Sequence, residues 1–199
     1  MKVHNYSAGP CILPQEVFQQ ASQAVLEYNG AGLSILEMSH RSKDIVAMAE
    51  NATALVKEML NVPAGYSVLF LQGGASTQFY MSALNLLKTD GKAGYIDTGA
   101  WSAKAIKEAK RLGDIEVLAS SKDKNYNYIP KGFDIPSGLD FLHYTTNNTI
   151  YGTEFFHTPK ADSILVADMS SDIFSRPVNV ADYGLIYAGA QKNLGPAGV

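Results

Sequence analysis

The chain has 199 residues, of which 46% are hydrophobic and 18% charged, and its formal net charge is −3. This composition is typical of a globular protein, and no apolar run is long enough to span a bilayer, so a membrane protein is not expected. Basic residues are scattered along the chain, which argues against a nucleic-acid partner and favours a small molecule. The single cysteine and a start without a secretory apolar stretch predict a cytoplasmic protein.

Two helical patterns come first in the chain. Residues 14–28 carry apolar side chains at helical spacing, start with a proline suited to a first turn, and close at an Asn-Gly pair. Residues 42–60 show the same spacing, with Ser42 as a candidate N-cap and Pro63 beyond the end. Both segments are therefore predicted to be helices.

Beyond residue 65 the pattern changes to short apolar runs separated by amphipathic segments. The runs predict strands at 66–72, 94–97, 115–120, 139–146, 163–168 and 183–189, and the segments between them predict helices at 76–88 and 102–112. Residues 120–138 are rich in turn formers and are predicted to be a long loop. Continuous apolar strands alternating with helices are typical of a largely parallel sheet covered on both faces, so the predicted fold class is α/β.

Polar groups follow several of these predicted strands. The segment Gly73-Gly74-Ala75-Ser76-Thr77 follows the first, Trp101 and Thr149 follow later ones, Asp168 ends another, and Lys192 comes just after the last. In parallel sheets the carboxyl ends of the strands meet at one edge, where ligands bind. We therefore expect these groups to lie near one another.

Each group has a bland structural explanation and a functional one. The double glycine is either a plain turn or, with the free N–H groups of the next helix and the hydroxyls of Ser76 and Thr77, a phosphate site. The strand-end acid Asp168 needs a partner, which is either a surface lysine or an N-cap role on the one hand or a protonated pyridine nitrogen on the other. Trp101 is either a core or rim aromatic or a stacking surface. Lys192 is either a solvated lysine or a partly desolvated amine able to form a Schiff base.

Taken together, these four groups match what a pyridoxal phosphate site requires from a protein. The motifs NYSAGP, SHRS, FLQGGASTQF, TGAWS, NNTIYG, VADMSSDIFSRP and YAGAQKNLGPAG occur in this order from one end of the chain to the other. In this order they resemble the phosphoserine aminotransferase family, which belongs to the class V, fold type I pyridoxal phosphate enzymes.

The resemblance implies a three-layer α/β/α fold with the mainly parallel sheet of the fold type I large domain. It implies an N-terminal active-site arm over residues 1–15 and a cofactor-binding large domain over 16–199. Longer family members continue through another sheet strand and a small C-terminal domain. The large domain is therefore expected to be incomplete at its C-terminus in this sequence.

The resemblance also implies roles for individual residues. Lys192 is implied to bind the cofactor covalently and to shuttle protons during catalysis, with Asp168 as the pyridinium partner and Trp101 as the stacking residue. The full set of implied cofactor-binding residues is Gly74, Ala75, Ser76, Trp101, Thr149, Asp168, Gln191 and Lys192, and the implied substrate-binding residues are Ala8, His40 and Arg41; no metal site is predicted. Some family members carry arginine at the position of Ser76, so a substrate-phosphate contact of that arginine is not carried over.

The implied activity is reversible transamination of phosphoserine and 2-oxoglutarate to 3-phosphohydroxypyruvate and glutamate in serine biosynthesis, by a homodimer with shared active sites. One alternative is another fold type I transaminase or a cysteine desulfurase-like enzyme, although SHRS and NYSAGP favour the phosphoserine branch. The other is a catalytically incomplete cofactor-binding fragment that needs a complementary chain.

Overall fold

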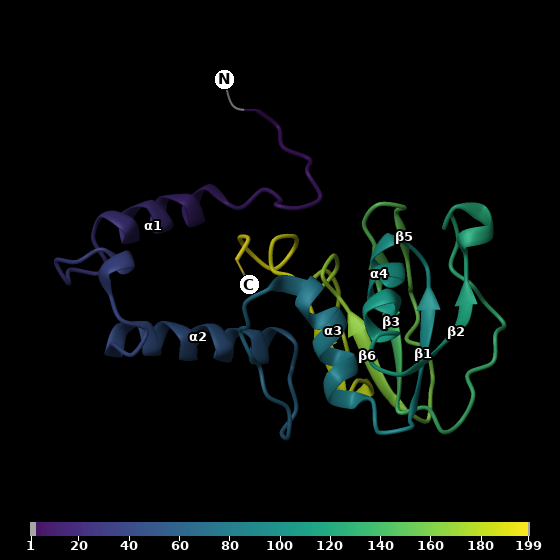
Figure 1. Ribbon diagram of the computed structural model, residues 1–199. Helices are drawn as coiled ribbons and strands as arrows, with labels where there is room; N and C mark the ends of the chain where they lie inside the picture. Colours follow the sequence, from purple (N-terminus) through teal and green to yellow (C-terminus); the bar gives the residue numbers. More distant parts are fainter. Residues whose placement is uncertain (1–2, 199) are drawn as a thin grey trace. The chain divides into compact units, whose positions relative to one another are not determined.

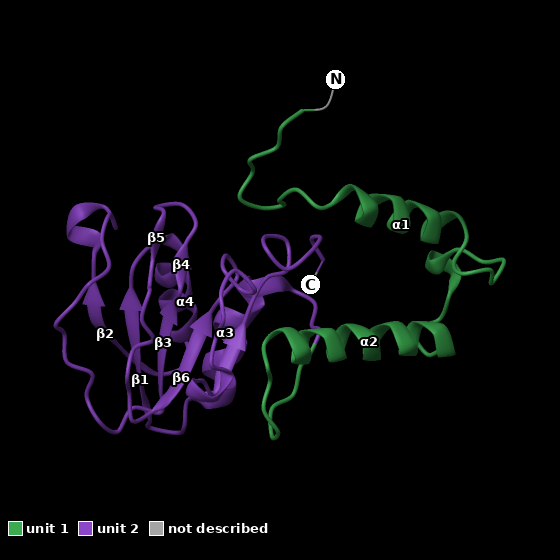
Figure 2. Cartoon of the chain, turned by 180° about the vertical axis from the view of Figure 1, so that it is seen from behind, with its two compact units in different colours: residues 1–69 green, residues 70–199 purple. Residues whose placement is uncertain are grey.

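The computed structural model describes residues 3–198, and the chain divides after Leu69 into two compact units, coloured separately in Figure 2. The first unit contains α1 (Gln15–Leu26), the short 3-10 helix η1 (Ile35–Glu37) and α2 (Lys43–Met59). The two predicted helices are therefore confirmed to within two residues at each end. This division does not test the predicted arm over 1–15 and domain over 16–199, which stay predictions.

Neither long helix of the first unit has a buried residue. Ser42 occupies the N-cap position of α2, but its hydroxyl donates to the carbonyl of Ser39 at 2.8 Å and accepts no hydrogen bond from the helix. Within residues 3–198, no helix combines the length and the apolar character that a bilayer span requires.

The second unit is built on a five-stranded parallel sheet with the order β2-β1-β3-β6-β7. Its strands are β1 (Lys92–Asp97), β2 (Asp114–Ser120), β3 (Phe141–Thr145), β6 (Ile164–Asp168) and β7 (Leu185–Tyr187). The register pairs Thr145 with Asp168 and Asp168 with Tyr187, so the carboxyl ends of three strands lie at one level. The predicted mainly parallel sheet with flanking helices is confirmed.

Helices α3 (Gly74–Leu86) and α4 (Ala100–Ala109) lie side by side on one face of this sheet (Figure 1). Both begin two residues before their predicted positions, directly after Gly73 and Gly99. Alanines allow the helices to approach the strands closely, and aromatic side chains fill the space between the layers. The buried core at this face includes Phe79, Ala83, Tyr95, Ala105, Ile106, Ala109, Phe141, Val166 and Tyr187.

The opposite face of the sheet is covered by connecting segments. Side chains alternate between the two faces along a strand, so Leu142 and Tyr144 point away from α3 and α4. The ring of Tyr144 packs edge-on against Phe155 at a centroid distance of 5.1 Å, and its hydroxyl lies 3.0 Å from that of Tyr183. Both faces of the central strands are therefore buried, as their continuous apolar sequence predicts.

Two parts of the predicted topology are wrong. Residues 66–72 form no strand in the described chain, and Leu69, Phe70 and Leu71 are 71%, 44% and 40% exposed. An apolar run indicates a tendency to be buried, but a strand exists only where a partner strand supplies a hydrogen-bond ladder.

The second difference is an antiparallel pair that was not predicted, formed by β4 (Asn147–Asn148) and β5 (Thr153–Glu154). The predicted loop at 120–138 is confirmed apart from η2 (Lys122–Lys124).

His143 lies completely buried in the middle of β3. Its ring stacks on Tyr95 with centroids 4.7 Å apart, and its Nε2 lies 2.7 Å from the hydroxyl of Tyr187. Its Nδ1 has no hydrogen-bond partner among the described residues. Burial lowers the pKa of His143 to about 3, so the folded protein holds this imidazole neutral at physiological pH.

The buried imidazole predicts an acid-sensitive second unit. An unfolded histidine has a pKa of about 6.5, so between that pH and about 3 the unfolded chain binds a proton that the folded chain does not. The free energy of unfolding should therefore decrease by about 1.4 kcal/mol per pH unit from this group as the pH falls through that window. Urea unfolding, followed by the fluorescence of the single tryptophan Trp101, measures this slope.

His143→Gln retains a polar atom for Tyr187. It should reduce the slope by about 1.4 kcal/mol per pH unit, which corresponds to one proton, between about pH 6.5 and 5, above the range in which carboxylates titrate. His157→Gln is the matched control, because His157 is exposed. Equal slopes in the wild type and the His143 variant would contradict the prediction.

Candidate functional site

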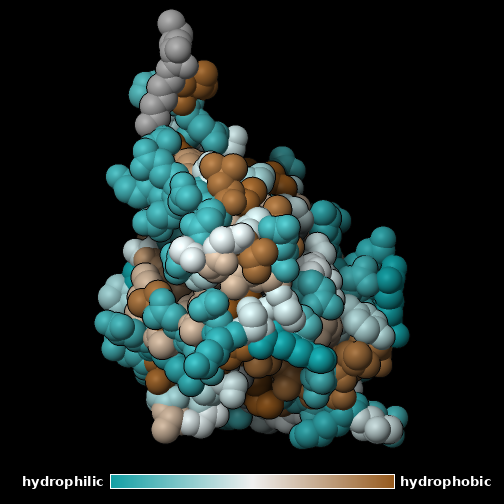
Figure 3. All heavy atoms as spheres, turned by 90° about the vertical axis from the view of Figure 1, so that its left-hand side faces the viewer, coloured by the Kyte–Doolittle hydropathy of each residue, from teal (hydrophilic) through white to brown (hydrophobic). Residues whose placement is uncertain are grey.

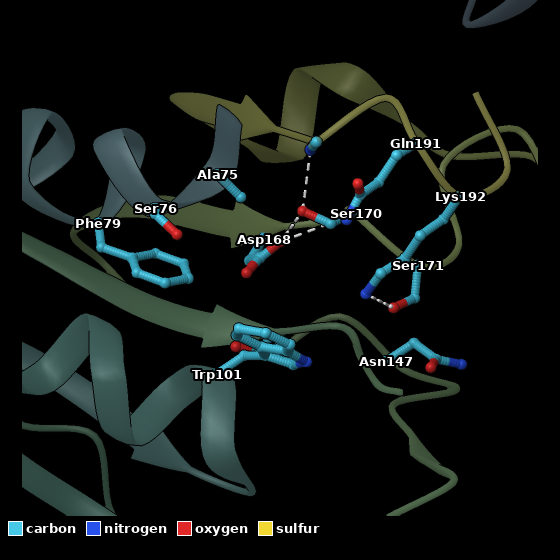
Figure 4. A pocket seen from close by; sticks show the side chains of 12 residues that line it. Ala75, Ser76, Phe79, Trp101, Asn147, Asp168, Ser170, Ser171, Gln191 and Lys192 are labelled. Atoms are coloured by element: carbon cyan, nitrogen blue, oxygen red, sulfur yellow. Dashed lines mark hydrogen bonds between the residues drawn. The ribbon is translucent and has the colours of Figure 1, made fainter. Parts of the chain in front are cut away.

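A pocket lies at the carboxyl edge of the sheet in the second unit (Figure 4). Its walls come from α3, α4 and the segments that follow β3, β6 and β7, as expected for a parallel sheet. The lining residues are Ala75, Ser76, Phe79, Trp101, Thr145, Asn147, Asp168, Ser170, Ser171, Gly189, Gln191 and Lys192. Most of the predicted cofactor-binding residues are thus brought together, namely Ala75, Ser76, Trp101, Asp168, Gln191 and Lys192.

The first turn of α3 forms one wall. Gly73 caps this helix with a φ of 93°, and a Cβ atom at Gly73 would lie 2.1 Å from Oγ1 of Thr77, so the turn requires glycine. The first N–H groups of a helix lack helical acceptors, and Ala75 and Ser76 of this turn line the pocket. The hydroxyl of Thr77, expected to face a ligand, instead donates to the carbonyl of Gly73 at 2.9 Å. Gly74 starts the helix but does not line the pocket.

Asp168 is buried at the carboxyl end of β6, with 3% of its surface exposed. Its Oδ1 accepts hydrogen bonds from the backbone N–H of Ser170 at 3.0 Å and from the hydroxyl of Ser170 at 2.6 Å. Its Oδ2 accepts no hydrogen bond from the described residues and points into the pocket (Figure 4).

Burial raises the pKa of the Asp168 carboxyl, while the two Ser170 hydrogen bonds and the charge of Lys192 act in the opposite direction. A cation bound beside Oδ2 would favour the ionised carboxylate further.

Lys192 points into the same pocket from the segment that follows β7. Its Nζ donates to the hydroxyls of Ser171, at 2.9 Å, and Thr149, and these two hydroxyl oxygens lie 2.6 Å apart. Burial lowers the pKa of Lys192, whereas the carboxylates of Asp168 and Asp172 oppose this shift. A lowered pKa increases the fraction of neutral amine, which is the nucleophilic form.

Trp101 is half-buried in the first turn of α4 and forms another wall of the pocket. The Nζ atoms of Lys104 and Lys192 lie 4.4 Å and 5.6 Å from its ring centroid. Its indole Nε1 is buried without a hydrogen-bond partner in the described part of the chain. The ring offers an aromatic surface beside Asp168 and Lys192, which suits the predicted stacking role.

The loop after β6 is held in place by a polar network. Asp172 accepts hydrogen bonds from the hydroxyl of Thr146 and from Nη2 of Arg176 at 3.2 Å. Arg176 also forms an ion pair with Glu154 at 2.8 Å and donates to the carbonyl of Phe155 at 2.7 Å. Since both Ser170 and Ser171 belong to this loop, the network fixes the side chains that contact Asp168 and Lys192.

Sequence reasoning missed four polar lining residues, namely Thr145, Asn147, Ser170 and Ser171. Ser170 and Ser171 follow Asp168 closely, so the rule that functional groups gather after strand ends could have included them. The three predicted substrate-binding residues, Ala8, His40 and Arg41, belong to the first unit and are not among the lining residues. Their role stays a prediction.

Comparison with known proteins gives consistent matches. The family profile described as Aminotransferase class-V matches residues 3–199. The phosphoserine aminotransferases of Flavobacterium psychrophilum and Parabacteroides distasonis are 58% and 57% identical to the chain over 199 residues. These alignments cover 100% of this chain and 56% of each relative, so the chain spans little more than half the length of these curated relatives.

Solved structures also match the fold of this chain. The phosphoserine aminotransferase of Bacillus circulans subsp. alkalophilus has a TM-score of 0.93 and 47% identity, over 98% of this chain and 55% of that one. The phosphoserine aminotransferase of Trichomonas vaginalis, solved with bound PLP, has a TM-score of 0.92 and 33% identity, over 99% of this chain and 56% of that one. With the family profile matching nearly its whole length and its sheet matching these folds, the chain belongs to the class-V aminotransferase family.

Proposed function

We propose that this chain forms the cofactor-binding part of a phosphoserine aminotransferase that uses pyridoxal phosphate. The observation that carries the proposal is the meeting of three groups in one pocket. These are the inward-facing Oδ2 of Asp168, the half-buried amine of Lys192 and the first turn of α3. Close relatives bear the name phosphoserine aminotransferase, which supports the choice of substrate.

The residues present fit pyridoxal phosphate. A buried carboxylate oxygen without a hydrogen-bond donor among the described residues suits the N–H of a protonated pyridine ring, which would bind Oδ2 of Asp168. The N–H groups of the first turn of α3, which lack helical acceptors, would hold the phosphate together with Gln191. Trp101 would stack on the ring, and Lys192 would bind the aldehyde carbon.

When bound, pyridoxal phosphate supplies an electron-withdrawing ring that acidifies the α-C–H of an attached amino acid. Asp168 would keep the ring nitrogen protonated by accepting its hydrogen bond at Oδ2. The neutral Nζ of Lys192 would take the proton from the substrate α-carbon as a general base. The hydroxyls of Thr149 and Ser171 would orient that amine, because both accept its hydrogen bonds in the structure.

The proposed substrates are phosphoserine and 2-oxoglutarate, bound in part by Ala8, His40 and Arg41. A second candidate is another fold type I transaminase or a cysteine desulfurase-like enzyme, since these also need a lysine and an acid. A third is a fragment that binds the cofactor but needs a complementary chain for turnover. We also propose a cytoplasmic location, which the single cysteine supports.

All three candidates require that pyridoxal phosphate bind covalently to Lys192, so removal of the Lys192 amine tests them together. Borohydride reduction of the chain with pyridoxal phosphate should attach the cofactor to the peptide that contains Lys192. Lys192→Ala should abolish this attachment and any turnover, whereas the exposed control Lys88→Ala should retain both. Mass spectrometry of the digested protein measures the attachment, and attachment at full yield in the Lys192 variant would sink the assignment.

Turnover is then tested with a panel of amino donors that contains phosphoserine, alanine, aspartate and cysteine. 2-oxoglutarate is the amino acceptor in each assay. Glutamate production with phosphoserine, and with none of the other donors, supports the proposal. Turnover of a different donor supports the second candidate, and attachment without turnover supports the third.

The amine of Lys192 should titrate at lower pH than that of an exposed lysine, because burial lowers its pKa. Reductive methylation across a range of pH, read out by mass spectrometry, gives a midpoint for each lysine. Asp168→Asn should lower the Lys192 midpoint further, since the Asp168 carboxylate stabilises the ammonium form. A midpoint for Lys192 that is not lower than the average midpoint of the other lysines would rule out the desolvated amine.

We further propose a homodimer that uses apolar side chains of the first unit. The exposed apolar residues of its two long helices are Val17, Phe18, Val25 and Leu26 in α1 and Val46, Met48, Leu55 and Met59 in α2. In Figure 3, apolar side chains (brown) lie at the surface among hydrophilic ones (teal). Apolar helix faces without cover favour association with another surface.

Analytical ultracentrifugation tests the dimer. Leu26 is 74% exposed, and its burial in an interface would contribute about 1.5–3 kcal/mol, so Leu26→Glu should weaken association about tenfold or more. Gln19→Glu adds the same charge to the same helix at a polar position and is the control. A wild-type chain that sediments as a monomer at all concentrations would remove the dimer from the proposal.

A further inference from the structure

We propose that Ser170 is a positioning residue for Asp168. It would hold one carboxylate oxygen so that the other faces the ring nitrogen of bound pyridoxal phosphate, and it would join the end of β6 to the segment that carries Lys192. This inference rests on the proposed function, because it assigns the ring nitrogen as the ligand of Oδ2. The link between the two segments is independent of any ligand.

The direction of each hydrogen bond at Ser170 follows from its partners. The backbone N–H of Gly189 can only donate, and it lies 3.0 Å from the hydroxyl oxygen of Ser170. An ionised Asp168 carboxylate can only accept, and its Oδ1 lies 2.6 Å from the same oxygen. The hydroxyl proton of Ser170 must therefore point at Oδ1.

This arrangement makes the two oxygens of Asp168 unequal. Oδ1 receives both the hydroxyl and the backbone N–H of Ser170, while Oδ2 receives no hydrogen bond from the described residues (Figure 4). Two donors on one oxygen restrict rotation of the carboxylate group. Oδ2 is thereby held toward the pocket before a ligand arrives. Binding of a cation then requires little reorientation of the carboxylate, so the free-energy cost of that reorientation is small.

Ser170 also sets how the acid and the lysine lie with respect to each other. Gly189 follows β7 and precedes Lys192 by three residues, and its N–H is bonded to Ser170. Asp168 and Lys192 therefore belong to two segments that one buried hydroxyl connects directly. Ser170 is 8% exposed, so water does not readily replace this contact.

The experiment compares cofactor binding by variants of the 199-residue chain that differ in one buried hydroxyl. Quenching of Trp101 fluorescence gives the dissociation constant of pyridoxal phosphate and that of its 1-deaza analogue, in which a C–H group replaces the ring nitrogen. Ser170→Ala should weaken binding of pyridoxal phosphate by about 10- to 100-fold, the range of a hydrogen bond to a charged group. It should leave binding of the deaza analogue unchanged.

Ser82→Ala is the matched control, because the Ser82 hydroxyl is buried and has no hydrogen-bond partner in the described chain. Its affinities should equal those of the wild type. Ser170→Cys keeps a similar shape with a weaker donor and should show a smaller, nitrogen-dependent loss; it decides the question if the alanine variant does not fold. In the Asp168→Ala background, Ser170→Ala should have no further effect on binding.

Two results would overturn the positioning role: an equal loss for both ligands, or no loss for pyridoxal phosphate. A wild-type chain that binds neither ligand would instead defeat the proposed function, together with the ring-nitrogen part of this inference. The link to Gly189 is then decided on the ligand-free protein by amide hydrogen exchange. Exchange at Gly189 should be faster in Ser170→Ala than in Ser82→Ala, and equal rates would refute the link.

Discussion

The carboxylate of Asp168 at the end of a buried strand is the constraint around which the site is arranged. Taking such a charge out of water is costly unless donors or cations compensate. Ser170 supplies two donors to one oxygen, and the ammonium form of Lys192 contributes from the same pocket. Lys192 is itself destabilised as a cation by burial. The ammonium of Lys192 and the carboxylate of Asp168 thus stabilise each other electrostatically, and the oxygen of Asp168 that accepts no hydrogen bond from the described residues faces the pocket.

Parallel pairing explains why these groups share one edge. The register aligns Asp168 with its neighbours on β3 and β7, so every segment that leaves these strands starts near the carboxylate. Phe79, Tyr187 and His143 are buried and their rings pack on one another, and Phe79 also lines the pocket. Burial raises the pKa of Asp168 and lowers the pKa of His143.

Local patterns in the sequence were sufficient for much of this architecture. Apolar spacing identified five strands of the sheet, because burial imposes a period on the sequence that does not depend on which partner covers it. The same spacing identified both helices of the first unit, although neither has a buried residue. The strand-end rule selected Trp101, Asp168 and Lys192, which line one pocket. Ala8, His40 and Arg41 came only from motif resemblance, and their contribution to a substrate site stays a prediction.

The sequence by itself determined which segments are apolar enough to be buried and which reactive side chains follow them. Only the tertiary structure decided that residues 66–72 form no strand, that Thr77 bonds to its own helix, and that Ser170 bonds to both Asp168 and Gly189. The physical reason is that burial is a property of one segment. Strand pairing and the direction of a hydroxyl group depend on partners that only the folded chain brings within hydrogen-bonding distance.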